Sequence, residues 1–293
     1  MSTFRPQSYL CVLKTHFNPA SQTPHLLNSF SRLIILHGLL ATALDLQRRE
    51  RMISGPILFH SKPWKSLITQ AYEKWKTDFD SSTKATLSNL PEHQSPEFQK
   101  SSTATLAVYH VALIALYTSL TDLQIYAGAR HILGRCIAPA GHARATQQIN
   151  TWAASTSMDG AVAVSHAAFL IRDGITKLRN WDAGDAFHYP LCLYIATITC
   201  WAFITGAPEN QKIPHPGDTG DSANDEDADW DAKAEMNALI SAITRAKAED
   251  LWRIRGRYRI GDLPNTIAKA LEGVRWAVVQ EGVVVLRGLL PGR

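Results

Sequence analysis

Residues 103–129, TATLAVYHVALIALYTSLTDLQIYAGA, decide the fold of this chain. Apolar residues such as Tyr109, Leu113 and Leu116 recur there at helical spacing, and the stretch contains a single charged residue. A helix that is apolar on nearly all sides belongs in the interior of a protein, because no polar face is left for solvent. We therefore expect the segment from Thr103 to Ile213, which begins with this stretch, to lie at the centre of the fold.

The sequence on either side of this stretch is also helical in pattern. Only 13 of the 111 residues between Thr103 and Ile213 are Asp, Glu, Lys or Arg. Apolar spacing predicts further helices at 26–46, 64–79, 142–157, 159–179, 188–205, 231–248 and 264–289. Strand signals are weak, so the sequence predicts an all-α fold, a single helical-bundle-like domain.

Two stretches are expected to lack regular structure. Residues 89–102 contain two prolines among polar residues and are predicted to be a loop. Residues 252–260 alternate between arginine and other residues, but the run is short and isolated, so we expect an extended connector. Four arginines in this run, at positions 253, 255, 257 and 259, are expected to form a solvated or neutralised face rather than a phosphate-binding stripe.

The composition changes abruptly after residue 213. Residues 214–235 hold eight acidic residues against one lysine, which predicts a solvated, disordered acidic loop over 214–232. A second interpretation is an acidic segment whose embedded Trp230 contacts a partner. We divide the chain into an N-terminal segment, 1–25, and a helical domain, 26–293, that this loop interrupts.

Composition and charge exclude several classes of protein. The chain has 293 residues and is 45% hydrophobic, which excludes wholesale disorder. Its net charge of +4 is too small by itself to indicate nucleic-acid binding. Four cysteines are too few for a disulfide scaffold, and none of their spacings suits a zinc finger. The start has no uninterrupted apolar run of the secretory type, and Leu191–Ala207 is better explained as a buried helix than as a membrane span. We expect an intracellular protein that does not enter membranes.

No established catalytic motif is present. The sequence contains no G-x-G-x-x-G, Walker A, G-x-S-x-G or H-E-x-x-H pattern. His131, Cys136 and His142 are metal ligands by type, but their spacings fit no closed zinc site and a fourth ligand is missing. Cys192 and Cys200 lie in a buried apolar run that keeps thiols inert. We therefore expect no metal and no cofactor.

A string of polar residues inside and after the central stretch supplies the candidate site. The candidate ligand-pocket residues are His110, Asp122, Gln124, Tyr126, Arg130, His131, His166 and His188. One interpretation is a helix-terminus network, in which Asp122 caps the next turn and pairs with Arg130, because buried polar groups need partners. The other interpretation is the edge of a small-molecule pocket that is covered by apolar residues.

Five segments together resemble the fungal-specific transcription factor domain. They are SRLIILHGLLATALDLQRRE (31–50), AVYHVALIALYTSLTDLQIYAGARHILGR (107–135), INTWAAS (149–155), HYPLCLYIATITCWAF (188–203) and VRWAVVQEGVVVLRGLL (274–290). The version found C-terminal to C2H2 zinc fingers in filamentous-fungal regulators is the most similar in character. The resemblance implies an all-helical regulatory domain, the middle homology region, which controls activity, binds effectors or supports dimerisation. This sequence departs from the family in having no zinc finger, so no direct DNA binding is expected.

Three hypotheses of function follow, and one of them is a purely structural interaction module. The first is a regulatory domain without a DNA-binding module that binds a lipophilic small-molecule effector or a protein partner; homodimerisation and a nuclear location would suit it. The alternative is a cytoplasmic, cofactor-independent biosynthetic enzyme, a pericyclase-like cyclase or isomerase, that acts on a lipophilic intermediate in a helical cavity. Its candidate catalytic residues are Asp122, Tyr126, His110 and His131.

Overall fold

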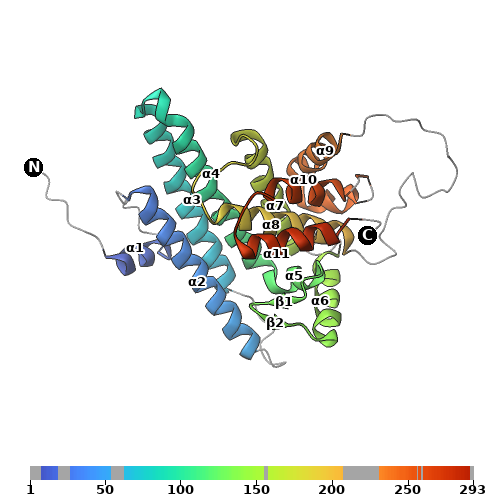
Figure 1. Ribbon diagram of the computed structural model, residues 1–293. Helices are drawn as coiled ribbons and strands as arrows, with labels where there is room; N and C mark the ends of the chain where they lie inside the picture. The colour runs from blue at the N-terminus through green and yellow to red at the C-terminus, as the bar shows by residue number, and fades with distance from the viewer. Residues whose placement is uncertain are drawn as a thin grey trace, which may run out of the picture.

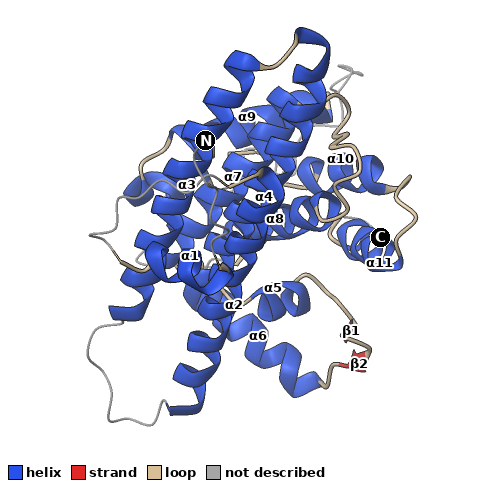
Figure 2. Ribbon diagram, turned by 90° about the vertical axis from the view of Figure 1, so that its left-hand side faces the viewer, coloured by secondary structure: helices blue, strands red, loops and turns tan. Residues whose placement is uncertain are grey.

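The fold is all-α, as the sequence predicts (Figures 1 and 2). The computed structural model describes residues 8–18, 27–53, 63–154, 158–206, 231–255, 257–258 and 260–290. Its α-helices are α1 (Tyr9–His16), α2 (Ser29–Ile53), α3 (Pro63–Asn89), α4 (Ser95–Tyr117), α5 (Leu120–Tyr126), α6 (Pro139–Trp152), α7 (Met158–Lys177), α8 (Tyr189–Thr205), α9 (Ala232–Arg245), α10 (Asp262–Leu271) and α11 (Ala277–Gly288). The 3-10 helices η1 (Glu92–Gln94) and η3 (Ala248–Ile254) and a hairpin of β1 (His131–Ile132) and β2 (Arg135–Cys136) complete the described elements.

Helices α4, α7 and α8 pack against one another at the centre. On one side, α2 and α3 cover α4, and α1 contacts both of them; on the other side, α9, α10 and α11 cover α7 and α8 (Figure 1). Helices α5 and α6 pack together at one end, against α8. The segment from Thr103 to Ile213 is expected at the centre, and its helices α4, α7 and α8 lie there; α4 is buried nearly all round from Thr103 to Leu116.

One continuous cluster of buried side chains runs from Val12 in α1 to Leu286 in α11. Trp75 is among its largest members, and its ring stacks between Phe79 and Tyr109, with ring centroids 5.0 and 5.8 Å away. Aromatic rings of this size contribute much of the buried apolar area, which is the main source of folding free energy. The cluster therefore joins the α2–α3 side of the molecule to the central helices.

Several predictions about local structure were wrong. Residues 89–102 do not form a loop: η1 begins at Glu92 and α4 at Ser95. Pro96 is tolerated because it lies in the first turn of α4, where the backbone N–H would have no helical partner anyway. The single helix expected at 264–289 is two helices, α10 and α11, separated by residues 272–276.

Other differences concern the ends of the predicted elements. A helix, α1, lies within the N-terminal segment 1–25, where none was expected. The central stretch breaks after Tyr117, and the connector expected at 252–260 begins as part of η3. The predicted acidic loop, 214–232, lies outside the described residues up to position 230.

One described helix is long and apolar enough to cross a membrane by length and composition alone. It is the Ser29–Glu50 part of α2, of which 28% is buried in the protein; η1, α4 and α5 pass the same test only as a pair bent by 86°. Ile35, Leu36 and Leu39 of α2 belong to the core. The candidate considered from the sequence, Leu191–Ala207, falls mainly on α8, which is 17 residues long and mostly buried. Core packing accounts for the apolar character of α8, whereas most of the apolar window of α2 lies outside the core.

Candidate functional site

The structure brings together two of the candidate residues, His110 of α4 and His166 of α7. Their Nδ1 atoms are 3.1 Å apart, which is a hydrogen bond between two imidazoles. One ring must donate its Nδ1–H and the other must accept with an unprotonated Nδ1, so the accepting ring is neutral while this contact exists. The pair forms because α4 and α7 pack closely and each places a histidine on the shared face.

Burial and neighbouring cations keep this histidine pair neutral. Burial lowers the pKa of His166 to about 4. Burial also lowers the pKa of His110 well below its usual range, and the charges of His166, Lys76, Lys177 and Arg172 lower it further. No carboxylate contributes to either shift. The pair is therefore uncharged at neutral pH.

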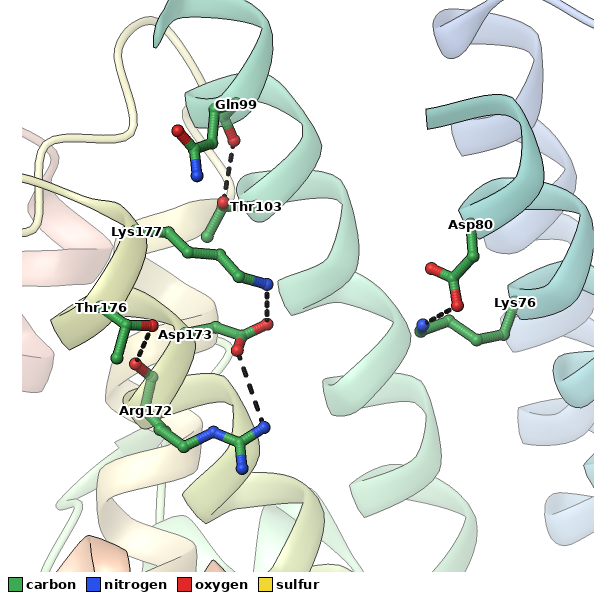
Figure 3. A network of polar contacts seen from close by, with 8 residues as sticks. All are labelled: Lys76, Asp80, Gln99, Thr103, Arg172, Asp173, Thr176 and Lys177. Atoms are coloured by element: carbon green, nitrogen blue, oxygen red, sulfur yellow. Dashed lines mark hydrogen bonds and ion pairs between the residues drawn. The ribbon is translucent and has the colours of Figure 1, made fainter. Parts of the chain in front are cut away.

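The cations near the histidine pair come from two helices. On α7, Lys177 pairs with Asp173 at 2.9 Å, and Arg172 lies over the ring of Phe169 with 4.8 Å between its guanidinium carbon and the ring centroid. On α3, Lys76 forms an ion pair with Asp80. Figure 3 shows these two groups on opposite sides of α4. Among the described residues, these surroundings provide no set of metal ligands.

Asp122 has different partners from those predicted. Ser119 caps α5, because its hydroxyl accepts a hydrogen bond from the backbone N–H of Asp122 at 3.3 Å. The Asp122 carboxylate pairs with Arg144 of α6 at 3.2 Å and not with Arg130, which is exposed. The helix-terminus network thus exists, but it joins α5 to α6.

The other candidates are spread over the molecule. Tyr126 contacts the ring of Trp201, Gln124 bonds to the carbonyl of Leu120, and His131 is exposed at the start of β1. His188, just before α8, contacts the carbonyl of Ala104 through Nε2 at 3.0 Å. In the described part of the chain, no hydrogen bond, ion pair or ring contact joins His110 to Asp122, Tyr126 or His131.

The buried cysteines and the candidate metal ligands lie in different parts of the molecule. Cys192 and Cys200 are buried, and burial raises the pKa of the Cys192 thiol to about 12. His131 and Cys136 face each other across the β-hairpin and are exposed. Among the described residues, no group of three or more His, Cys, Asp and Glu side chains is placed to hold a metal ion.

The prediction for Arg255 was wrong. This arginine was expected on a solvated face, but its side chain is 2% exposed and lies over the ring of Phe203, 4.4 Å from the centroid. Nη2 donates to the carbonyl of Ala153, whereas Nε and Nη1 are buried without a hydrogen-bond partner in the described structure. Burial lowers the pKa of Arg255 to about 10, so it remains charged at neutral pH. Arg253 in the same run is exposed and pairs with Asp250 at 2.9 Å.

A small polar pocket lies between α2, α3 and α4, and the sequence did not indicate it. It has a volume of about 10 Å³, room for about one water molecule. Its lining residues are Ser29, Arg32, Phe79, Ser82, Thr83, Phe98, Ser101, Ser102 and Thr105. The hydroxyl-rich runs at 81–83 and 101–105 are the only signal in the sequence, and only the packing of three helices brings them together.

Arg32 is the one charged residue that lines this pocket. Its Nη1 donates to the carbonyl of Leu27, and its own carbonyl accepts a hydrogen bond from Trp75 Nε1 at 2.9 Å. Burial lowers the pKa of Arg32, and the nearby Asp78 carboxylate partly offsets that shift. Within the described residues, the buried Nε atom has no acceptor.

Comparison with known proteins gives three relatives, all fungal. The chain is 34% identical over 287 residues to the nicotinate catabolism cluster-specific transcription factor of Emericella nidulans, covering 96% of this chain and 31% of that protein. It is 24% identical to zinc finger protein klf1 of Schizosaccharomyces pombe (97% of this chain, 34% of that protein) and 22% identical to zinc finger protein zas1 of the same organism (90% and 28%). The chain spans about a third of the length of these relatives. No family model and no solved structure matches it.

Proposed function

We propose that this chain is the helical regulatory part of a fungal transcription regulator, and that it responds to a small-molecule effector or a protein partner. The observation that carries the proposal is the similarity to the nicotinate catabolism cluster-specific transcription factor, which extends over 96% of the chain. A match of this extent includes nearly every described helix, so it concerns the whole fold and not one motif. The regulator would act in the nucleus.

Two arginines with buried N–H groups that lack a hydrogen-bond partner support the effector part of the proposal. Arg255 keeps two unpaired donors in the interior and Arg32 keeps one. An unpaired buried donor costs about 1–3 kcal/mol of stability. Groups of this kind are typical of places where a protein meets a ligand or a partner, because such contact supplies the missing acceptor.

The arginine run 253–259 supports a role away from the DNA bases. A phosphate-binding stripe needs several arginines exposed on one face. Here Arg255 is buried beneath Phe203 and Arg253 is paired with Asp250. We propose that the described helices regulate a DNA-bound protein and do not themselves contact bases.

A reporter assay tests the proposal. The chain is fused to an unrelated DNA-binding domain in a filamentous fungus that carries the matching reporter gene, and the DNA-binding domain alone is the control. We expect the fusion to change reporter expression several-fold relative to that control, and nicotinate is the first effector to add, given the function in the relative's name. A fusion that is stable and nuclear by microscopy but leaves expression at the control level, with and without nicotinate, contradicts the proposal.

A further inference from the structure

We propose that the pocket between α2, α3 and α4 binds the carboxylate group of a small organic acid, with Arg32 as the residue that recognises it. The inference rests on the proposed function, because it names the chemical class of the effector. It uses a site that the sequence did not indicate and that lies apart from the histidine pair.

The guanidinium of Arg32 is held at Nη1, and its buried Nε has no hydrogen-bond partner in the described residues. Nη1 is bound to the carbonyl of Leu27, and Trp75 holds the Arg32 backbone through its indole N–H. Nε and Nη2 form the other edge of the guanidinium, and in the described residues the buried Nε has no hydrogen-bond partner. Two parallel N–H groups on one edge match the two oxygens of a carboxylate.

The lining of the pocket suits the rest of such a ligand. Ser82, Thr83 and Ser102 are half-buried and can donate hydroxyl hydrogen bonds to a bound oxygen. Phe79 and Phe98 add apolar surface for the body of an organic acid. Because the enclosed space is about 10 Å³, one carboxylate oxygen fits inside, and the second oxygen and the ring or chain of the ligand would lie at the mouth.

Charge favours a carboxylate over a phosphate. Arg32 is the only cation in the lining, and the Asp78 carboxylate is close enough to raise its pKa. A monoanion neutralises a single guanidinium, whereas a phosphate with a charge near −2 would leave an excess beside Asp78. The pocket therefore fits the end of a monocarboxylic acid.

Binding to the purified chain tests this inference. Benzoate and nicotinate are titrated by calorimetry at constant ionic strength, with benzamide and nicotinamide as neutral matches and inorganic phosphate as the competing oxyanion. We expect saturable binding of at least one of the two acids, no binding of its amide, and weaker binding of phosphate. The ring stack of Trp75 on Phe79 also predicts a fluorescence change that is lost in Trp75→Phe.

Three variants identify the residue responsible. Arg32→Lys keeps the charge but loses the two-donor edge, and Ser102→Leu fills the pocket while keeping Arg32. Each should weaken binding of the acid about tenfold or more, since a hydrogen bond to a charged group accounts for such a factor. Arg48→Lys is the matched control, because Arg48 lies on the same helix with its side chain 73% exposed.

The results separate this inference from the proposed function. Absence of saturable binding of both acids, equal binding of acid and amide, tighter binding of phosphate, or unchanged affinity in folded Arg32→Lys and Ser102→Leu overturns it. A reporter fusion that still works in that case leaves the proposed function standing. Binding of the acid with a silent reporter would overturn the proposed function alone.

Discussion

At the scale of single residues, the histidine pair shows how burial sets protonation. The hydrogen bond between His110 and His166 needs a neutral accepting ring, and burial of both rings, with Lys76, Arg172 and Lys177 near His110, keeps the pair neutral at neutral pH. A proton added to the pair would place a buried charge next to these three cations, and a proton on each ring would break the contact. The pair therefore makes the α4–α7 contact sensitive to acid.

The pH dependence of stability follows from these pKa shifts. The pKa of His166 is lowered from 6.5 to about 4 in the folded state, so between these values the unfolded chain binds more protons and stability falls as pH falls. For His166 the loss is about 2–3 kcal/mol at a pH near 4.5, and His110 adds to it. Urea unfolding at neutral pH and at pH near 4.5 should show a smaller difference in His166→Phe than in the wild type.

The control for this experiment is His93→Gln, which removes an exposed histidine. It should keep the wild-type difference in unfolding free energy between the two pH values. Equal pH dependence in wild type and His166→Phe would show that the pair does not titrate as inferred.

Replacement of Arg255 is expected to raise the free energy of unfolding. Arg255→Met keeps an unbranched stem on Phe203 and removes a desolvated charge with two unpaired donors, at the loss of one hydrogen bond to Ala153. We expect the variant to be about 1 kcal/mol more stable in urea unfolding. A loss of about 2 kcal/mol or more would mean that the guanidinium has partners in the folded protein.

At the scale of elements, the contact between α7 and α8 depends on a glycine. A Cβ on Gly174 would lie 2.4 Å from the hydroxyl of Tyr189 and 2.7 Å from the ring of Trp181. Gly174→Ala should therefore lower the unfolding free energy by about 1–3 kcal/mol, although alanine is the better helix former. Gly273→Ala, where a Cβ meets nothing within 4 Å, is the control and should change stability by no more than about 0.5 kcal/mol in the same urea unfolding. Equal effects of the two substitutions would contradict this account.

The elements also show which signals in the sequence were reliable. Helices were identified where apolar residues recur over many turns, as in α4, α7 and α8. The errors arose at prolines and short breaks. Pro96 was read as a loop residue although it begins α4, and residues 272–276 interrupt an apolar pattern that reads as one helix. Periodicity indicates which face is buried, but it does not show where a chain turns.

At the scale of the whole molecule, the single buried cluster predicts cooperative unfolding. It contains residues of every helix from α1 to α11, so no group of these helices has a core of its own. Urea unfolding followed by far-UV circular dichroism and by tryptophan fluorescence should give one transition with the same midpoint. Two separate midpoints would contradict the division of the chain into one helical domain with a short N-terminal segment.

The sequence by itself determined the all-α class, the central position of residues 103–117 and the burial of Cys192 and Cys200. These properties depend on the apolar content and spacing of contiguous residues, which is local information. It also supplied His110 and His166 as candidates, but only the packing of α4 on α7 placed them in contact. The Arg32 pocket and the buried guanidinium of Arg255 were decided by tertiary structure alone. Each depends on segments far apart in the chain meeting around one side chain, and no pattern within a single segment encodes that meeting.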